Sequence, residues 1–138
     1  MATLNVFEVI DKAGKARSKA QKVAILKEND HWAIRDILNG TFNDRIKWNL
    51  PPGAPPYNPN DGHNAPSSLY KRNTDFKHFV LGGPGDRLPA FKREKIFIGL
   101  IEAIHPKDAE LVIAMINKEK PKGITRNVVE EAYPGLLS

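Results

Sequence analysis

The sequence predicts an all-α fold, a single domain of six or seven short helices with a long proline-rich loop inside it. Three observations favour this class. Apolar residues recur at helical spacing in most segments, no segment shows the strict alternation of a half-buried strand, and good capping residues precede several apolar stretches. The 138 residues, 41% of them hydrophobic, suffice for one ordinary domain with a sizeable core, so residues 1–138 are expected to form one unit.

The first third of the chain predicts three short helices. Thr3 is the expected cap of the first helix. Ser18 and Gln21 form a capping-box pattern before the second. Asp30 is the expected cap of the third helix. The apolar stripe of that third helix comprises Trp32, Ile34, Ile37 and Leu38.

The middle of the chain predicts a long surface loop within the domain, over residues 51–73. Its first part, residues 51–66, is so rich in proline, glycine and asparagine that it cannot form a regular helix. Trp48, Tyr57 and Tyr70 flank or lie in this loop. They could stack on nucleic-acid bases, dock a protein partner, or pin the loop to the core. Pinning is the preferred interpretation, because large aromatic side chains are usually partly buried.

The second half of the chain predicts four more helical segments. A short helix is expected over residues 75–81, and the clearest helix of the protein, PAFKREKIFIGLIEAI, over residues 89–104. Pro106 opens another helix, which Pro121 ends, and Thr125 caps a final short one. The apolar residues of the long helix that are expected to face the core are Phe91, Ile96, Phe97, Leu100, Ile101 and Ile104.

The bulk composition restricts the function. The net charge of +5 favours an anionic partner, most simply nucleic acid, although a basic soluble domain without such a partner has the same composition. The absence of cysteine excludes disulfides, thiol catalysis and cysteine-ligated zinc. No apolar run reaches the length of a membrane span, and the first residues lack the pattern of a secretory signal. A reducing, aqueous compartment and no membrane partner are therefore expected.

The segment KEKPKGITR, residues 118–126, predicts a phosphate-binding site. Gly123 has no side chain, so a ligand could approach its backbone closely. Thr125 is a good helix cap, and the first turn after it offers free backbone N–H groups and the positive end of the helix dipole. Basic residues surround this point, but lysines between helices are usually only solvated, and the same pattern begins many helices that bind nothing. These basic residues are Lys118, Lys120, Lys122 and Arg126.

Two more basic groups support a nucleic-acid partner. One brackets the turn between the first two helices and includes Lys12 and Lys22, and the other surrounds the start of the long helix and includes Lys95. If all three groups face one way, they form a single track for a DNA backbone, which positions a protein without reading sequence. The expected DNA-contacting residues are Lys15, Arg17, Lys19, Arg87, Lys92, Arg93, Lys120, Lys122, Gly123, Thr125 and Arg126.

Four motifs occur in an order that resembles a known family. They are QKVAIL (Gln21 to Leu26), RLPAFKREKIFIGLIEAI (Arg87 to Ile104), Gly123-Ile124-Thr125 and Pro134-Gly135-Leu136. The ATP-dependent DNA ligases of T-even-type bacteriophages have a similar QKQAIL segment. They also have a basic residue and a leucine before a long helix, a Gly-small-Ser/Thr helix start and a Pro-Gly-Leu stop, all in their N-terminal domain.

The resemblance implies an all-helical domain that grips duplex DNA around a nick, through the minor groove and the backbone. Carried over by position, Thr125 and Arg126 become phosphate contacts, and Arg87 and Lys92 become a second contact group. The expected partner is double-stranded or nicked DNA. The resemblance also implies a phage protein that acts in the cytoplasm of the infected bacterial host.

The chain departs from the ligases in its catalytic machinery. Those enzymes take AMP from ATP on the lysine of a Lys-x-Asp-Gly motif. Here the only Asp-Gly is Asp61-Gly62, and Pro59 stands in place of the lysine. No nucleophile, base and orienting group converge elsewhere in the sequence, and the four histidines show no metal-ligand spacing. The sequence therefore predicts a non-catalytic protein without a cofactor or metal.

A protein-interaction module on the same fold is the alternative function. The proline-rich loop with its aromatic residues looks like an insertion relative to the ligase domain, and it suggests a docking element. The partner would then be a replication or transcription protein of the phage or of its host.

Overall fold

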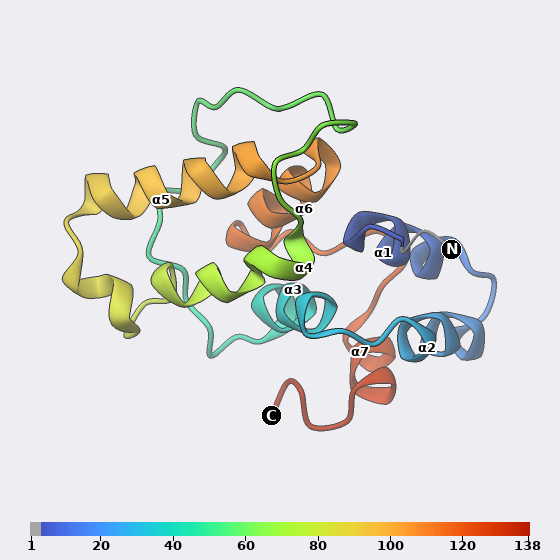
Figure 1. The fold of residues 1–138 in the computed structure, drawn as a ribbon. Coiled ribbons are helices and arrows are strands. Elements are labelled where there is room, and N and C mark those ends of the chain that lie inside the picture. Colours follow the sequence, from blue (N-terminus) through green and yellow to red (C-terminus); the bar gives the residue numbers. More distant parts are fainter. Residues whose placement is uncertain (1–3) are drawn as a thin grey trace.

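The computed structural model describes residues 4–138, and this part of the chain is all-α, as expected (Figure 1). Two short 3₁₀-helices, η1 (Asn73–His78) and η2 (Pro84–Arg87), precede the longest helix. The extended pairing within the described residues is a single isolated bridge between Trp48 and Val80. The seven α-helices are α1 (Val6–Lys15), α2 (Lys19–Glu28), α3 (Trp32–Phe42), α4 (Leu69–Arg72), α5 (Ala90–Ala103), α6 (Pro106–Ile116) and α7 (Arg126–Ala132).

Helix α6 lies at the centre of the packing, because α1, α3 and α5 all contact it. Helix α2 packs against α1 on one side and α7 on the other. Burying each large apolar side chain contributes about 1.5–3 kcal/mol, so one continuous cluster of such residues is the main source of stability. The largest fully buried side chains include Leu26, Ile34, Phe42, Phe79, Leu100, Met115 and Tyr133.

Capping boxes begin the first two helices. The Ser18 hydroxyl accepts a hydrogen bond from the Gln21 backbone N–H at 3.2 Å, and the Gln21 side chain accepts one from the Ser18 N–H at 3.3 Å. This box at α2 confirms the sequence pattern. At α1 the cap is Asn5, whose N–H donates to the Glu8 carboxylate at 3.0 Å. Thr3, the expected cap of this helix, lies outside the described residues.

The start of α3 differs from the expectation in two ways. His31 rather than Asp30 is the cap, and its Nδ1 accepts a hydrogen bond from the Ala33 N–H at 3.0 Å. Asp30 instead forms a two-pronged ion pair with Arg35, at 2.7 and 2.8 Å. Trp32 was expected on the core-facing stripe but is 68% exposed. At the first position of the helix it projects past the core, and the Arg35 guanidinium stacks over its ring.

The apolar face of α5 is buried as expected, except at its first turn. Phe97, Leu100 and Ile101 lie in the core, whereas Phe91 is 67% exposed. The helical spacing is right for Phe91, but the first turn of α5 extends beyond the other α-helices, to the end of the molecule where only η2 accompanies it (Figure 1). Periodicity predicts which face of a helix is apolar, and it does not show where the core stops.

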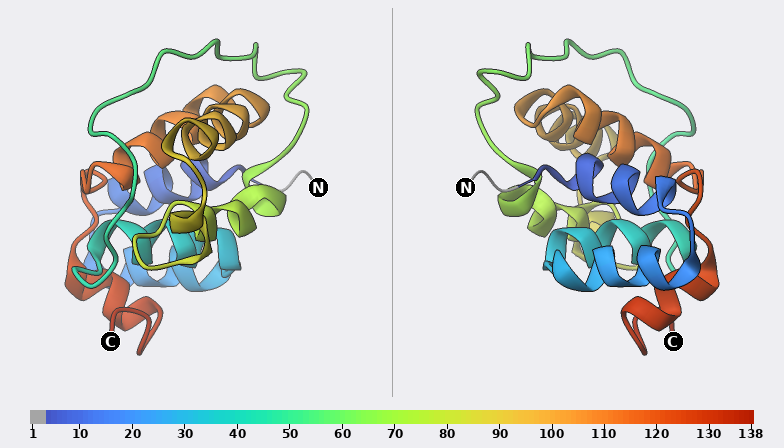
Figure 2. Two further views of the ribbon diagram at one scale, coloured as in Figure 1. Left: turned by 90° about the vertical axis from the view of Figure 1, so that its left-hand side faces the viewer. Right: turned by 90° about the vertical axis from the view of Figure 1, so that its right-hand side faces the viewer.

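The proline-rich loop ends earlier than expected. It contains no helix from residue 51 to residue 68, but α4 begins at Leu69 because the Ser68 hydroxyl accepts a hydrogen bond from the Tyr70 N–H at 3.1 Å. Figure 2 shows the loop rising as an arch beyond α5 and α6. The helix expected over residues 75–81 is shifted toward the N-terminus and is formed by α4 together with η1.

Polar contacts fasten the loop to α5 and α6 at several points. The Gly53 N–H donates to the Asn117 side chain at 2.7 Å, and the Asn58 N–H donates to the Glu102 carboxylate at 2.8 Å. The Asn60 amide donates to backbone carbonyls at the end of α5, the closest being that of Ile104 at 2.6 Å. The loop is therefore held at both ends of the α5–α6 pair.

The aromatic residues near the loop pin it to the core, as preferred from sequence. The Trp48 indole N–H donates to the Gly40 carbonyl at 3.1 Å, and its ring packs edge-on against Phe76. The Tyr70 hydroxyl donates to the Leu4 carbonyl at 2.5 Å. Tyr57 is half-buried and packs against the core.

A buried carboxylate joins the beginnings of α1 and α6. Asp108, in the first turn of α6, accepts a hydrogen bond from the Phe7 N–H at 2.8 Å, although the two residues are far apart in sequence. Burial raises the pKa of Asp108 from its ordinary 3.8 to about 6, while the Phe7 N–H and the nearby His105 oppose that increase. Asp108 therefore supplies a free N–H of α1 with an acceptor.

Candidate nucleic-acid interface

The predicted helix start at Thr125 is present. The Thr125 hydroxyl accepts a hydrogen bond from the Val128 N–H at 3.3 Å and so caps α7. Thr125 and the preceding Lys122 are exposed. Helix α7 is short, and its apolar residues Val128 and Val129 are buried against the rest of the fold.

The backbone of Gly123 is in close contact with another part of the same chain, the backbone of Gly14. A Cβ at Gly123 would lie 2.1 Å from the Gly14 carbonyl oxygen, and a Cβ at Gly14 would lie 2.3 Å from the Lys122 carbonyl oxygen. Gly123 also has a φ of +81°, which favours glycine. The end of α1 therefore fills the space that a side chain at Gly123 would need, whereas Gly123 itself is exposed, and its expected ligand contact stays a prediction.

The Lys22 side chain stabilises this backbone contact. Its ammonium group donates to the Gly14 carbonyl at 2.8 Å and to the Gly123 carbonyl at 2.7 Å. Charge-assisted hydrogen bonds of this kind are stronger than neutral ones. Lys22 is therefore a structural residue that holds the α6–α7 loop against the α1–α2 turn.

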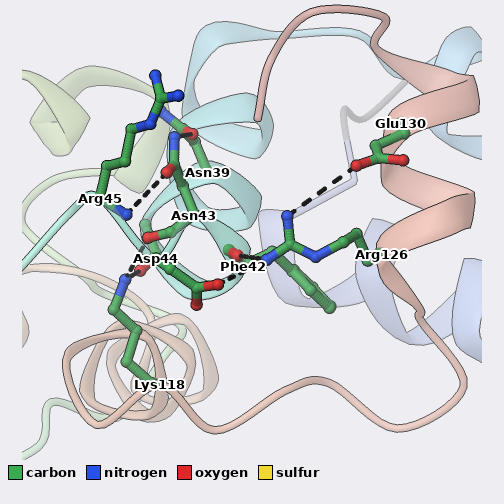
Figure 3. Close-up of polar contacts among 9 residues, drawn as sticks. Asn39, Phe42, Asn43, Asp44, Arg45, Lys118, Arg126 and Glu130 are labelled. Carbon is green, nitrogen blue, oxygen red and sulfur yellow. Dashed lines mark hydrogen bonds and ion pairs between the residues drawn. The ribbon is translucent and has the colours of Figure 1, made fainter. Parts of the chain in front are cut away.

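Lys118 and Arg126 cap the carboxyl end of α3 by donating hydrogen bonds to its last carbonyls (Figure 3). The Lys118 ammonium donates to the Gly40 carbonyl at 2.6 Å and to the Asn43 carbonyl at 2.9 Å. The Arg126 guanidinium donates to the Phe42 carbonyl. The last carbonyls of a helix have no partners within it, and they carry the negative end of its dipole, so two cations there are stabilising.

Both Lys118 and Arg126 thus donate hydrogen bonds to backbone carbonyls of the protein itself. Burial lowers the pKa of Lys118, although the nearby Asp44 carboxylate opposes that shift. Arg126 also lies 3.4 Å from the Asp44 carboxylate and 4.0 Å from that of Glu130. Its guanidinium remains partly exposed, but the expected phosphate contact would have to compete with three internal acceptors.

The glycine contact brings two of the three basic groups side by side. The exposed cations of the α1–α2 turn and of the α6–α7 loop together form what we call the basic surface. Lys15 forms an ion pair with Asp11 at 2.9 Å, and Lys19 forms one with Glu131 at 2.9 Å. The other cations of this surface form no ion pair within the described residues. The basic surface comprises Lys12, Lys15, Arg17, Lys19, Lys120 and Lys122.

Two shallow hollows border the α6–α7 loop, and each is lined by three lysines. The first, of about 410 Å³, contains Lys15, Lys107 and Lys122 together with the carboxylates of Asp11 and Glu110. The second, of about 420 Å³, contains Lys47, Lys118 and Lys120 together with the Asp44 carboxylate. Lys107 and Lys47 were not predicted as site residues, because only the packing of α1 on α6 and of residue 47 beside α3 brings them to the loop.

The third basic group lies elsewhere. In Figure 1 the α1–α2 turn is at the right edge of the molecule, whereas η2 and the start of α5 are at the left edge. Arg87 and Lys92 are exposed there and do not join the basic surface. The third basic group is therefore separate from the basic surface, and the expectation of one track for a DNA backbone stays a prediction.

Arg93 is a structural residue rather than a free cation. It is only 9% exposed, and its guanidinium donates to the carbonyls of Asn49 at 2.7 Å, Leu88 at 3.0 Å and Gly85 at 3.2 Å. These bonds join the segment just before the loop, η2 and α5. The expected DNA contact of Arg93 is excluded by this burial.

The described residues contain no cluster of three or more histidine and acidic side chains that could hold a metal ion. Among the same residues, none of the helices combines the length and the apolar composition that a membrane span requires.

Comparison with known proteins gives one relationship. No curated protein matches the chain. A model of a protein family matches residues 9–122, which extend from within α1 through α6 to the lysines of the α6–α7 loop, but do not include Thr125 and Arg126. Because this match covers most of the chain, the protein belongs to the family of unknown function DUF6433.

Proposed function

We propose that this protein is a non-catalytic DNA-binding domain that holds double-stranded or nicked DNA through phosphate contacts on the basic surface. One observation carries the proposal. The Gly14–Gly123 contact, locked by Lys22, places two lysine-rich segments side by side, on a chain of net charge +5. Cations grouped in this way neutralise phosphates and release counterions, which favours binding regardless of sequence.

The proposal includes a relationship to the N-terminal domain of T-even-type phage DNA ligases. The all-helical fold, the Ser18–Gln21 capping box at the start of QKVAIL and the Thr125 cap are compatible with that resemblance. A phage protein of this kind acts in the cytoplasm of the infected bacterium. Arg87 and Lys92, the second contact group that the resemblance implies, lie far from the basic surface, so an experiment must separate the two groups.

Fluorescence anisotropy on intact, nicked and single-stranded DNA of one sequence, titrated across salt, tests the proposal. Four double variants carry the same change in charge. Two alter the basic surface (Lys120→Glu with Lys122→Glu, and Lys12→Glu with Arg17→Glu), one alters the opposite end (Arg87→Glu with Lys92→Glu), and one is a control on α4 and η1 (Lys71→Glu with Lys77→Glu). Arg126 and Lys118 are left intact because the fold uses them.

Salt-dependent binding to duplex or nicked DNA is expected. Each basic-surface variant should lose at least about tenfold in affinity, and its log–log salt slope should fall by about 0.9 for each lost phosphate contact. Loss in the Arg87/Lys92 variant instead would move the DNA to the other end. Equal losses in all four variants, or no binding at low salt, would overturn the proposal.

A further inference from the structure

The lysine-rich hollow between the end of α3 and the α6–α7 loop also contains an aromatic ring, and we call it the Trp48 hollow. Trp48 and Ile116 supply its apolar part, and Lys47, Lys118 and Lys120 supply its cations. Its volume of about 420 Å³ lies within the roughly 300–1,000 Å³ of small-ligand pockets. An indole ring beside several ammonium groups suits single-stranded nucleic acid, because every base has a face that can stack and every phosphate is an anion.

The protein fixes the Trp48 ring while leaving part of it exposed. The indole N–H donates to the Gly40 carbonyl at 3.1 Å. A Cβ at Gly40 would lie 2.5 Å from the indole, so the absence of a side chain there lets the ring lie against α3. The Phe76 ring packs against the indole at a nearly perpendicular angle of 86°. A ring that is already held in place loses little conformational entropy when a base stacks on it.

Lys118 is fixed in the same hollow and still has a donor to offer. The turn that ends α6 holds its backbone at a φ of +58°, and there the Lys118 N–H donates to the Met115 carbonyl at 3.0 Å. An ammonium group has three N–H donors, and the carbonyls of Gly40 and Asn43 accept two of them. Because Lys118 lines the hollow, its third N–H is available to an anion.

The charge of the Trp48 hollow also favours an anion. Lys47 and Lys120 are exposed and form no ion pair within residues 4–138. The one carboxylate among the described residues that line the hollow, Asp44, lies 3.4 Å from the Arg126 guanidinium (Figure 3). Burial lowers the pKa of Lys118, and although Asp44 opposes this shift, the Lys47 ammonium adds to it. A phosphate among these ammonium groups therefore reduces their mutual repulsion.

Trp48 also lines a second hollow, between α3 and η1, which lacks this excess of positive charge. That hollow has a volume of about 250 Å³, and it contains one lysine, Lys77, and one carboxylate, Asp36. The Asn73 amide donates to the Asp36 carboxylate at 2.7 Å. A phosphate is therefore favoured on the side of Trp48 that carries three lysines, and the second hollow provides a matched control.

We propose that the Trp48 hollow binds an unpaired nucleotide, with the base stacked on Trp48 and the phosphate held by Lys47, Lys118 and Lys120. The faces of a base inside a duplex are covered by its neighbours, so the hollow selects single-stranded nucleic acid or a free nucleotide over intact duplex. This inference goes beyond the proposed grip on duplex DNA. Lys120 is the one residue that the hollow shares with the basic surface, and neither activity requires the other.

Tryptophan fluorescence tests the stacking directly, because a base that stacks on an indole ring quenches its emission. The chain contains two tryptophans, so Trp32→Phe leaves Trp48 as the single indole. Trp32 is 68% exposed, and its replacement therefore leaves the core intact. The probes are a short thymidine oligonucleotide, the same strand with abasic sites in place of its bases, an intact duplex, and thymidine monophosphate.

Three further variants are compared in the Trp32→Phe background. Lys47→Glu alters the Trp48 hollow, and Lys77→Glu makes the same change of charge in the second hollow. Lys12→Glu with Arg17→Glu alters the basic surface alone. Trp48 and Lys118 are kept, because their replacement also removes their hydrogen bonds to Gly40. Titrations at about 0.15 M salt screen charges that lie more than about 8 Å from the ligand.

The oligonucleotide is expected to quench Trp48, and the abasic strand and the intact duplex should leave its emission unchanged. Lys47→Glu should weaken the binding of the oligonucleotide by at least about tenfold, and Lys77→Glu should leave it within about twofold. Tighter binding of the oligonucleotide than of thymidine monophosphate identifies a strand as the ligand, whereas equal binding identifies a free nucleotide.

The failure of this inference is distinguishable from that of the proposed duplex binding. Lys12→Glu with Arg17→Glu should weaken anisotropy on intact duplex and leave the quenching by the oligonucleotide within about twofold. Loss of quenching in that variant would place the unpaired nucleotide on the basic surface and reject the Trp48 hollow. The inference would also be overturned by no quenching, by equal quenching with the abasic strand or the duplex, or by equal losses in Lys47→Glu and Lys77→Glu.

Discussion

Gly14 and Gly123 lie backbone against backbone, so that neither residue has space for a side chain. The contact joins the end of α1 to the loop before α7, and the Lys22 ammonium bonds to both glycine carbonyls. The relative position of the two lysine-rich segments therefore depends on the smallest possible residue at two points. Three alanine variants can separate the close contact from the backbone conformation.

Gly14→Ala and Gly123→Ala should both destabilise the protein strongly. Gly14→Ala tests the steric clash alone. Gly123→Ala also forces alanine into a left-handed φ, so we expect this variant to lower the free energy of unfolding by about 3 kcal/mol or more. Gly135→Ala is the control, since Gly135 has a similar φ of +84° with nothing within 4 Å, and it should cost only about 1–2 kcal/mol. Urea unfolding measures the three free energies. Equal values for Gly123→Ala and Gly135→Ala would contradict the close contact.

Removal of either cation from the end of α3 should destabilise that helix. Lys118→Ala and Arg126→Ala should each lower the free energy of unfolding by about 1–2 kcal/mol, because carbonyls at the helix end lose charged donors. Lys122→Ala, an exposed lysine of the same loop, should stay within about 0.5 kcal/mol. Hydrogen exchange of the last amides of α3 should accelerate in the first two variants only. Unchanged exchange in Lys118→Ala would exclude its capping role.

Asp108 should make stability fall between about pH 4 and pH 7. Its pKa is raised from 3.8 to about 6 in the folded protein, so folding favours the protonated form and the stabilisation is lost as pH rises through 6. The full difference corresponds to about 3 kcal/mol. Asp108→Asn retains an acceptor for the Phe7 N–H, and it should therefore stabilise the protein at pH 8.

The measurement is the difference in unfolding free energy between wild type and Asp108→Asn from pH 4 to pH 8. This difference should be small at pH 4 and grow with pH. Glu110→Gln, an exposed residue of the same helical turn, is the control and should give a flat difference. A flat difference for Asp108→Asn would show that the buried carboxyl titrates normally.

Arg93→Met should unfold or loosen the end of the molecule that carries Phe91. The substitution retains an apolar stem but leaves the carbonyls of Asn49, Gly85 and Leu88 without a donor, at a cost of about 2 kcal/mol or more. Lys92→Met, the exposed neighbour, should change stability by less than about 0.5 kcal/mol. Thermal unfolding followed by circular dichroism compares the two. Equal melting temperatures would show that Arg93 does not hold η2 and the loop to α5.

The local signals in the sequence predicted much of the fold. The Ser18–Gln21 box, the Thr125 cap and the helix start at Pro106 are present, because each depends on residues within one helical turn. The loop was also predicted, since proline removes backbone donors wherever it occurs. Ser68 is a comparable cap, and it begins a helix that was missed in a segment interpreted as loop.

The roles of individual cations could not be predicted. Lys118, Arg126 and Arg93 resemble any exposed basic residue in sequence, but their partners are backbone carbonyls of distant segments. A carbonyl belongs to every residue, so such a contact has no sequence signature. The exposure of Phe91 has a similar origin, because the helical period continues past the point where neighbouring helices end.

The bonds made by the segment from Lys118 to Tyr133 also influence when the protein can fold. Lys22 reaches Gly123 across 101 residues, and the Tyr133 hydroxyl donates to the Leu26 carbonyl across 107. The ends of α2 and α3 therefore gain their partners only after the segment up to Tyr133 has left the ribosome. Long-range contacts of this kind slow folding, so we expect the first three helices to pack stably only once the segment from Lys118 to Tyr133 has been synthesised.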